Sequence, residues 1–440
     1  MRKYITHPLG IFIIIIHVLY FLLACKIGSI YLVDSYGYLN QAKNLVLHQS
    51  WYAEEWNAPT LIDYFTIRPP LYAFLIVICK SIFNSDIFVI AIQNIFSIFN
   101  IFLIWKLLEK FKLEQKNITI SICLSLLLFP SQLIHANFIM TEILFQTLLL
   151  GTFYFSAIAI HKPDLASFFK IAALLSLAML TKPVIFLFGI VLFLFFLIIL
   201  FKKNKKILMP FLLLPITYHV LCLQNQHTTG YYHYSSIKIM ADMRVNARYI
   251  LVQKYGEDSA ASFASKVFHE ADSMTDYGKR YEFISASCNE VYKQNKTTFG
   301  LLYLKGMVST FFDPGRFDLA VFWGIQDNRR LGFLHRFHAE GIKSIPDILK
   351  DQPIILLVFL LFILLWNMII ILGFSVFIFD KKNDLLVRIL VFIFIGYIVV
   401  ATGISGLCRY RVPIYPELVF TFAFAFPLMS RFIKRKFSHA

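Results

Sequence analysis

The feature that most constrains this chain is a series of apolar runs, each of about 20 residues, that recur from its beginning to its end. As a helix, such a run crosses the ~30 Å hydrocarbon core of a bilayer. Only 15% of the 440 residues are charged, against ~25% in soluble domains, and the mean hydropathy is +0.67. These values exclude a soluble enzyme, a disordered regulator and a fibrous protein. The sequence predicts an all-α polytopic membrane protein.

We expect about ten transmembrane helices. Their predicted ranges are 9–33, 87–105, 118–134, 138–160, 165–181, 183–201, 207–223, 353–373, 389–408 and 412–430. No small-residue cleavage site precedes Asp34, so the first run is expected to be a retained helix rather than a signal peptide.

The loops between the predicted spans are short except at 34–86 and 224–352. The chain therefore divides into an N-terminal transmembrane module (1–223) with a long first outer loop, a small extracytoplasmic loop domain (224–352) and C-terminal transmembrane helices (353–440). Within the first outer loop, 71–85 is apolar but too short for a span. Its apolar residues fall on one face at helical spacing, which favours a helix lying in the membrane interface. They are Leu71, Phe74, Leu75, Ile78 and Ile82.

The distribution of Lys and Arg predicts the orientation, because cytoplasmic loops are enriched in them. With the N-terminus inside, the inner segments hold Arg2, Lys3, Lys106, Lys110, Lys112, Lys116, Lys162, Lys202, Lys203, Lys205, Lys206, Lys381, Lys382, Arg388, Arg431, Lys434, Arg435 and Lys436. The short outer segments hold only Lys43, Arg68, Lys80, Lys182, Arg409 and Arg411. We therefore expect both termini in the cytoplasm and the large loop outside. The net charge of +16 reflects this bias, so it does not imply a nucleic-acid partner.

The few charged residues near the outer ends of the predicted spans are the candidate site. They are the acids Asp34 and Glu142 and the bases Arg68, Lys182, Arg409 and Arg411. A carboxylate inside a span costs roughly 2.5–3.5 kcal/mol, so Glu142, expected one and a half turns inside 138–160, needs a partner or a cavity. Two carboxylates facing four cations suit a transferase that acts on an anionic lipid. The cations hold a phosphate leaving group, and a carboxylate takes a proton from the incoming hydroxyl.

Each of these residues also has a structural interpretation. The two arginines of Arg409-Tyr410-Arg411 could extend from a helix end to the interface, and Lys182 could be an interfacial anchor. Glu142 and Glu417 could be ion-pair partners, and Asp34 could end a helix. Arg68-Pro69-Pro70 could serve only as a rigid entry into the interfacial helix. The functional interpretation depends on all of these residues lying on one face.

The motifs resemble a known family. An acid follows the first span, in Val33-Asp34-Ser35, and Arg68-Pro69-Pro70-Leu71-Tyr72 opens the interfacial helix. Thr141-Glu142 lies at the outer end of a later span, and Arg409-Tyr410-Arg411-Val412-Pro413 opens the last. This pattern is similar to the family-39-like glycosyltransferases of the GT-C superfamily, which include protein O-mannosyltransferases and aminoarabinose transferases of lipid A. The resemblance covers most of 1–200 and 400–430.

The resemblance implies a polyprenyl- or dolichyl-phosphate sugar as donor and an acceptor reached on the non-cytoplasmic face. By position, Asp34 is similar to the catalytic base and Glu142 to a second acid. Arg68, Arg409 and Arg411 match residues that contact the donor phosphate, and Lys182 is expected to join them. The residues expected to line the substrate site are Tyr38, Tyr72, Asn137 and Tyr410.

The chain also departs from the family pattern. Ser35 stands where a second acid is common, no acid precedes Arg68, and the first outer loop has no DxD motif. These departures favour a mechanism without a metal but leave a divalent ion open. The six cysteines are scattered without a CxxC pair or a disulfide pattern.

The expected function is an inverting transfer from a polyprenyl-phosphate sugar to a glycan, lipid or protein hydroxyl, in a bacterial inner membrane and on its periplasmic face. An O-antigen-type polymerase or ligase acting on diphosphate-linked glycans is an alternative. A transporter of lipid-linked sugars is another, although no repeat relates the two halves of the chain. In the large loop, the turn Asp313-Pro314-Gly315 and its aromatic flanks suggest a hairpin on the membrane surface. It would cap the donor cavity or select the acceptor, or belong to a packed domain without a catalytic part.

Overall fold

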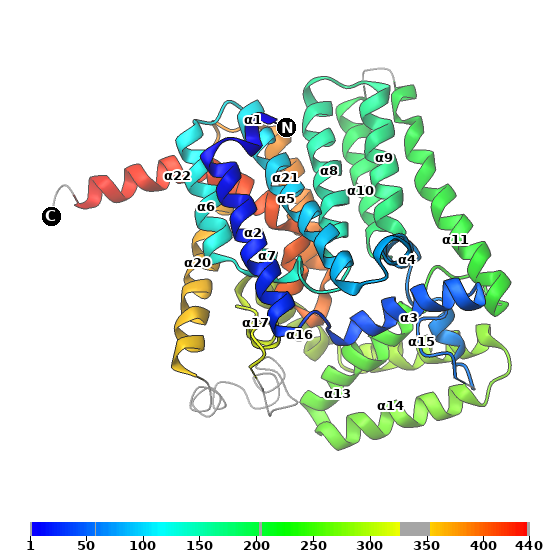
Figure 1. The fold of residues 1–440 in the computed structure, drawn as a ribbon. Coiled ribbons are helices and arrows are strands. Elements are labelled where there is room, and N and C mark those ends of the chain that lie inside the picture. The colour runs from blue at the N-terminus through cyan, green and yellow to red at the C-terminus, as the bar shows by residue number, and fades with distance from the viewer. Residues whose placement is uncertain (1, 58, 202–204, 326–352, 438–440) are drawn as a thin grey trace.

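Figure 1 shows the fold in a computed structural model, which describes residues 2–57, 59–201, 205–325 and 353–437. Every regular element in these ranges is a helix. Long helices pack side by side as a bundle. Helices α3 (Val33–His48), α13 (Arg248–Tyr255), α14 (Glu257–Asp272) and α15 (Tyr277–Gln294) lie at the end of the bundle away from the N-terminus. The predicted all-α fold is confirmed.

In the described part of the chain, six helical segments are long and apolar enough to cross a membrane. They are α2 (Pro8–Ile27), α5 (Asp86–Lys110), α8 (Glu142–His161), η2 with α11 (Lys205–Thr229), α20 (Ile354–Phe379) and Cys408–Arg431. The last lies mostly in α22 (Tyr415–Phe437). Shorter apolar helices occupy the remaining predicted spans, namely α6 (Gln115–Leu128), α9 (Leu165–Met179), α10 (Ile185–Ile199) and α21 (Leu385–Ala401). The chain is thus an all-α polytopic membrane protein.

Two predicted spans are shorter than expected because of glycine and proline. The span 9–33 ends with α2 at Ile27, where Gly28 adopts φ +76°, a left-handed conformation that glycine accepts without strain. The span 118–134 is divided between α6 and α7 (Ser131–His135). Pro130 follows the break, and proline disfavours helical geometry at the residue before it. A short extended segment and a new helix, α3, therefore separate the first span from the outer loop.

The span predicted at 138–160 begins later than expected. Its helix, α8, starts at Glu142, because polar side chains of α5 take up backbone groups that a helix would use. Gln93 Nε2 donates to the carbonyl oxygens of Phe138 at 2.6 Å and Ala136 at 3.3 Å. The preceding residues therefore remain in turns. Glu142 is the first residue of the helix, not one and a half turns inside it.

Helix α4 (Leu71–Phe83) corresponds to the predicted interfacial helix. Its predicted apolar face points outward, with Phe74, Ile78 and Ile82 exposed. Its opposite face is buried against the bundle through Tyr72, Ala73, Ile76 and Cys79. The helix is apolar on both faces, as expected where one faces lipid and the other protein.

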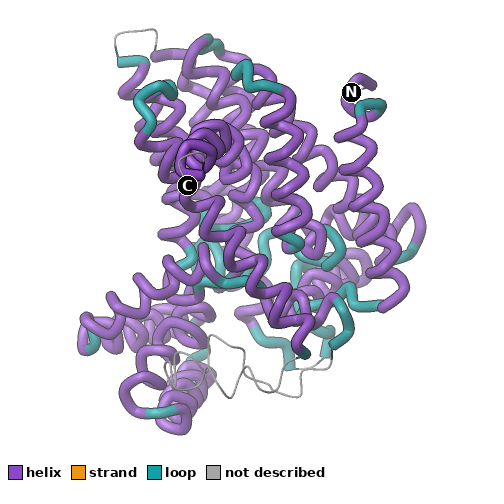
Figure 2. Tube along the Cα trace, turned by 90° about the vertical axis from the view of Figure 1, so that its left-hand side faces the viewer, coloured by secondary structure: helices purple, strands orange, loops and turns teal. Residues whose placement is uncertain are grey.

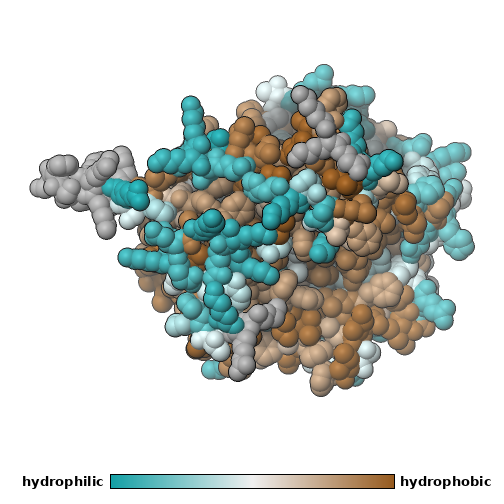
Figure 3. All heavy atoms as spheres, turned by 90° about the horizontal axis from the view of Figure 1, so that it is seen from above, coloured by the Kyte–Doolittle hydropathy of each residue, from teal (hydrophilic) through white to brown (hydrophobic). Residues whose placement is uncertain are grey.

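The main apolar core lies between the bundle helices, and α8 is its most buried long helix. Other helices expose apolar side chains outward, as α20 does with Ile354, Ile355 and Leu361. Figure 3 looks onto the end of the molecule that carries the N-terminus. Hydrophilic side chains gather over part of this face, and hydrophobic ones fill much of the remainder. Outward apolar faces of this kind match a lipid surround.

The large loop forms a second, smaller helical layer. Helix α11 continues past the predicted boundary at 223 and ends at Thr229. The layer then comprises α12 (Ile237–Ala241), the π-helical turn η3 (Asp242–Ala247), α13 to α15, α16 (Lys296–Phe312) and α17 (Arg316–Phe322). Its separate apolar core includes Ile239, Met243, Ile250, Ile284 and Leu302. Figure 2 shows the layer from a second direction. The remainder of the predicted 224–352 domain, 326–352, lies outside the described residues.

A buried ion pair fixes this layer to the first outer loop. Asp63, on η1 (Ile62–Phe65), accepts hydrogen bonds from Arg280 Nη2 at 2.5 Å and from the Tyr277 hydroxyl at 3.0 Å. The backbone oxygen of Asp63 also accepts from the Ser236 hydroxyl at 2.6 Å. The side chains of Asp63 and Arg280 are only 2% and 8% exposed. The loop layer and the first outer loop therefore form one unit around the end of the bundle.

We expect Arg280→Ala to destabilise the protein by about 3–5 kcal/mol, because it leaves the Asp63 carboxylate buried without its charged partner. Arg248→Ala is the matched control. Arg248 pairs with Glu257 in the same layer, but these side chains are 41% and 44% exposed, and exposed pairs contribute at most about 1 kcal/mol. Unfolding in detergent micelles measures both variants. Equal stability of the two would show that the Asp63 pair does not hold the layer in place.

Candidate active site

The candidate site begins in the first turn of α3. After Gly28 the chain is extended, and α3 starts at Val33 with Asp34 in its first turn. The backbone N–H of Leu32 donates to Ser35 Oγ at 2.9 Å, which satisfies a polar group at the helix start. The N-terminal end of a helix stabilises a negative charge. The start of α3 therefore places Asp34 where a negative charge is stabilised.

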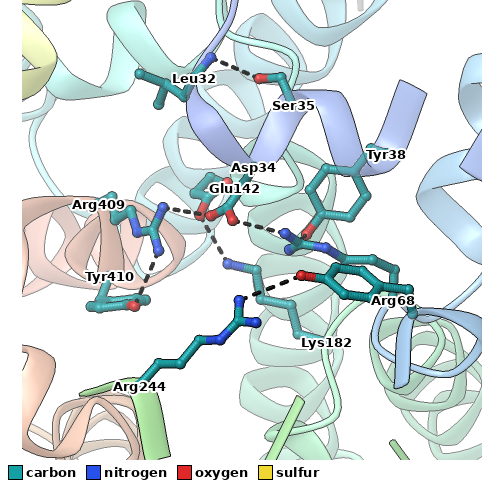
Figure 4. A network of polar contacts seen from close by, with 11 residues as sticks. Leu32, Asp34, Ser35, Tyr38, Arg68, Glu142, Lys182, Arg244, Arg409 and Tyr410 are labelled. Carbon is teal, nitrogen blue, oxygen red and sulfur yellow. Dashed lines mark hydrogen bonds and ion pairs between the residues drawn. The ribbon is translucent and has the colours of Figure 1, made fainter. Parts of the chain in front are cut away.

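Asp34 lies between two arginines from distant parts of the chain (Figure 4). Arg68 Nη2 donates to Asp34 Oδ1 at 2.7 Å, and Arg409 Nη1 donates to Asp34 Oδ2 at 2.9 Å. Burial raises the pKa of the Asp34 carboxyl, but the charges of Arg409 and Arg68 outweigh it and hold that pKa below its ordinary value. Asp34 is therefore a carboxylate at neutral pH, and each arginine is aimed by it.

Arg68 is aligned by α3 as well as by Asp34. Its Nη1 donates to the Tyr38 hydroxyl at 3.1 Å, and its guanidinium carbon lies 4.5 Å from the centre of the Tyr38 ring. Its backbone oxygen accepts from Gln41 Nε2 at 2.8 Å. Pro69 and Pro70 then lead directly into α4. The guanidinium thus lies over an aromatic ring, with one nitrogen bonded to the Tyr38 hydroxyl and another to Asp34.

Glu142 and Lys182 form a second ion pair beside Asp34 (Figure 4). Lys182 comes from the turn between α9 and α10, and its Nζ lies 2.9 Å from Glu142 Oε1. The Glu142 side chain is 2% exposed. Its other oxygen, Oε2, has no hydrogen-bond partner among the described residues. A buried carboxylate oxygen of this kind is an available acceptor next to the Asp34 pair.

Arg244 is a cation of the site that the sequence did not predict. It lies on the π-helical turn η3 and is exposed, and its Nη1 donates to the Tyr64 hydroxyl at 3.4 Å. In Figure 4 its side chain reaches from the loop layer toward Lys182 and Asp34. No carboxylate pairs with it within the part of the chain that the structure describes. Nothing in the mixed-charge sequence around Arg244 distinguishes it from its neighbours.

Arg411, a predicted phosphate ligand, does not join this cluster. Its guanidinium donates to the carbonyl oxygens of Phe311 and Asp313, and it lies 4.6 Å from the centre of the Phe129 ring. The residue is only 1% exposed. Arg409 and Arg411 are two positions apart on the 3-10 helix η6 (Cys408–Ile414), so their side chains leave in different directions. Arg411 is therefore part of the packing around the site, whereas Arg409 faces Asp34.

The predicted substrate-lining residues also differ in whether they are exposed at the site or buried in the packing around it. Tyr410 is partly exposed, and its hydroxyl accepts from Arg409 Nη2 at 3.3 Å. Tyr38 is mostly buried under Arg68, and Tyr72 is buried behind it with the ring centres 5.0 Å apart. Asn137 is buried between α5 and the turn before α8, where it accepts from Asn94 Nδ2 at 2.9 Å. Of these residues, Tyr410 offers the most open surface to a ligand.

The cluster carries more positive than negative charge. It combines two carboxylates, Asp34 and Glu142, with the cations Arg68, Lys182 and Arg409, and the side chain of Arg244 extends toward it in Figure 4. Each carboxylate neutralises only part of this charge, so an anion that enters between the cations is stabilised. No group of three or more His, Cys, Asp and Glu side chains that could hold a metal ion occurs among the described residues. The arrangement suits an anionic ligand with an acceptor group beside it.

Comparison with known proteins links part of the chain to a family. Residues 67–223 match the family described as dolichyl-phosphate-mannose-protein mannosyltransferase. The match covers about a third of the chain and includes Arg68, Glu142 and Lys182. No curated protein matches the chain. The match confirms the resemblance that the sequence motifs indicated.

Proposed function

We propose that this membrane glycosyltransferase of the GT-C type moves a sugar from a polyprenyl-phosphate donor to an acceptor hydroxyl, with inversion at the anomeric carbon. The observation that carries the proposal is the position of Asp34 between Arg68 and Arg409. The three residues come from α3, the loop before α4 and the segment before α22. A carboxylate base next to guanidinium groups is the pairing needed to move a proton and to hold a departing phosphate.

The donor phosphate is proposed to bind between Arg68, Arg409, Lys182 and Arg244. Arginine binds a phosphate through two parallel N–H groups. The guanidinium groups of Arg68 and Arg409 already point at one place because Asp34 holds both. Arg244 approaches from the loop layer, and among the described residues its hydrogen-bond partner is the neutral Tyr64 hydroxyl. These cations stabilise the charge that develops on the phosphate as the sugar leaves, which is usually the largest single contribution to catalysis.

In the proposed reaction step, the oxygen of the acceptor hydroxyl attacks the anomeric carbon of the sugar. The bond from that carbon to the phosphate oxygen breaks, and its electron pair leaves with the lipid phosphate. The hydroxyl proton passes to Asp34. Attack from the side opposite the phosphate inverts the configuration. All the atoms and charges come from donor, acceptor and Asp34, so the step needs no further reactant.

The low pKa of Asp34 in the free protein is compatible with its role as base. Arg409 and Arg68 lower this pKa against the effect of burial. A bound phosphate competes for the same N–H groups and brings its own negative charge, and both effects raise the affinity of Asp34 for a proton. The carboxylate therefore becomes more basic once the donor is bound. This sequence of events favours transfer over premature protonation.

Glu142 is proposed to act beside Asp34 as a second acid. Its Oε1 holds Lys182 at 2.9 Å, and its Oε2 is buried without a hydrogen-bond partner among the described residues. An acceptor hydroxyl that donates to Oε2 would be held next to the base. The carboxylate would thus orient both the ammonium group of Lys182 and the acceptor.

The site is proposed to face the periplasm of a bacterial inner membrane, with both termini in the cytoplasm. Two features support this orientation. The Lys and Arg distribution predicts the loops around 34–86 and 224–352 to be outside. The site residues come from the end of the bundle that carries these loops, away from the N-terminus (Figure 1). A glycan, a lipid or a protein could present the acceptor hydroxyl there.

Proteoliposomes supplied with a panel of radiolabelled polyprenyl-phosphate sugars test this function. We expect transfer from at least one of these monosaccharide donors, with release of one lipid phosphate for each sugar transferred. Asp34→Asn protein, reconstituted in parallel, is expected to lack this activity. Absence of turnover with every monosaccharide donor, together with activity on undecaprenyl-diphosphate glycans, would instead favour a polymerase or a ligase.

A further inference from the structure

The segment that carries Arg409 is anchored by the side chain of Asp313. This residue lies in the turn between α16 and α17, as the motif Asp313-Pro314-Gly315 predicts. Asp313 Oδ2 accepts from the backbone N–H of Cys408 at 2.8 Å, and Oδ1 accepts from the N–H of Gly315 at 3.0 Å. The carboxylate thus joins its own turn to the residue that directly precedes Arg409.

Arg411 anchors the same segment in the opposite direction. Its Nη2 donates to the carbonyl oxygen of Asp313 at 3.1 Å, and its Nη1 donates to that of Phe311. Asp313 therefore binds the backbone before Arg409, and Arg411 binds the backbone around Asp313. We call this reciprocal pair of contacts the clamp. Arg411 is buried, so its contacts are shielded from water and strengthened.

Close backbone packing supports the clamp along α16. A Cβ atom on Gly406 would lie 1.9 Å from the backbone oxygen of Gly306, so the backbones of these two segments are in direct contact at this point. Thr310 Oγ1 and Thr402 Oγ1 lie 3.0 Å apart in the same seam. The approach to Arg409 is therefore held along its length by α16 and by the turn after it, and the position of Arg409 depends on both.

We propose that Asp313 and Arg411 are positioning residues, whose clamp holds the segment 408–411 so that the guanidinium of Arg409 meets Asp34 and the donor phosphate. This inference rests on the proposed function and assigns part of the large loop a role in it. The Arg409 side chain contacts Asp34 and the adjacent Tyr410. Its Nε is buried and has no hydrogen-bond partner in the part of the chain that the structure describes. Asp34 holds the guanidinium, and the backbone anchors of Asp313 and Arg411 fix the segment from which Arg409 extends.

A double-mutant cycle separates this role from a general contribution to folding. If Asp313 acts through Arg409, Asp313→Ala matters only while Arg409 is present, because residues that act as a unit are not additive. The probe is polyprenyl phosphate, the product lipid, whose Kd is measured in proteoliposomes without any need for turnover. We expect Asp313→Ala to raise this Kd about tenfold in the wild type and in an Arg68→Ala background, and not to change it further in an Arg409→Ala background.

Asp276→Ala is the matched control. Asp276 is an exposed carboxylate of the same layer that also accepts from a backbone N–H, that of Lys279 at 3.1 Å, and it does not contact 408–411. We expect it to leave the Kd unchanged. Asp313→Asn, which keeps an oxygen for the Cys408 N–H, is expected to restore most of the affinity. If Asp313→Ala does not fold, Arg411→Lys runs through the same cycle, since an ammonium group lacks the planar fork with which the guanidinium reaches both carbonyl oxygens.

The outcomes of this cycle distinguish a failure of the positioning role from a failure of the proposed transferase function. The positioning role is overturned if Asp313→Ala changes the Kd equally with and without Arg409, or if it changes the Kd in neither background. Either result leaves the proposed function intact. If Arg68→Ala and Arg409→Ala themselves bind polyprenyl phosphate as the wild type does, the proposed phosphate site is wrong and the positioning role falls with it.

Discussion

We expect Asp34→Asn to lower the rate of sugar transfer by about 10²–10⁴-fold, the range typical for the loss of a general base. The amide has nearly the same shape as the carboxylate, but it cannot take the proton of the acceptor hydroxyl. Donor binding responds differently. Removing the negative charge from between Arg68 and Arg409 leaves both arginines free for a phosphate. We therefore expect the Kd for polyprenyl phosphate to stay the same or to fall while turnover is lost.

The control for this prediction is Asp86→Asn. Asp86 is also a partly buried carboxylate held by a cation and a tyrosine, since it pairs with Lys80 at 2.9 Å and accepts from the Tyr31 hydroxyl at 2.8 Å. We expect this variant to transfer sugar at a near-normal rate. If Asp34→Asn also keeps near-normal rates, Asp34 is not the base. Glu142→Gln then becomes the decisive variant, because Glu142 Oε2 is the other available carboxylate oxygen.

The proximity of Asp34, Arg68 and Arg409 could be predicted from the sequence because it depends on topology. Each residue lies at the end of an apolar helix or next to one, and helix ends on the same side of a membrane meet in one layer. The Lys and Arg distribution assigned all three to the same side. The structure brings them within hydrogen-bond distance of one another through Asp34. The fold class followed from the same apolar runs and is confirmed.

The direction of each side chain could not be predicted in this way. Arg409 and Arg411 both looked like site residues because they share one motif, but only Arg409 contacts Asp34. Their directions depend on the 3-10 geometry of η6, which the sequence pattern does not reveal. Tyr72 and Asn137 likewise lie next to predicted site residues in the chain, yet both are buried in the bundle.

The start of α8 and the contribution of Arg244 were missed for a related reason. Gln93, inside an apolar span, binds the backbone oxygens of residues before α8 and delays the helix until Glu142. A polar residue in a span signals a partner, but it does not identify that partner. Arg244 reaches the site through the packing of the loop layer. Long-range contacts of this kind leave no periodic signal in the sequence.

Arg409→Ala is expected to reduce kcat/KM for the donor by about 10²–10³-fold, the effect of removing one preorganised group that stabilises developing negative charge. It should also change the pH dependence in a defined direction. In the wild type, burial raises the pKa of Asp34, and Arg409 and Arg68 together lower it below the ordinary value. Without Arg409, Arg68 is the ion-pair partner left to Asp34 among the described residues, and burial is opposed by one charge instead of two.

The sign of the pH effect follows from which form of Asp34 is active. The base must be deprotonated, so kcat/KM falls as the pH drops through the pKa of Asp34 in the free enzyme. Loss of Arg409 raises that pKa, so the acid limb of the profile moves to higher pH, by about 1–2 units.

Arg409→Lys separates the effect of charge from the effect of geometry. It keeps the positive charge and should leave the acid limb nearly unmoved, but it loses two-point phosphate binding and should still raise the KM for the donor. An Arg409→Ala enzyme with the acid limb of the wild type would show that Arg409 does not contact Asp34 in the membrane, and it would remove the main support for the proposed site.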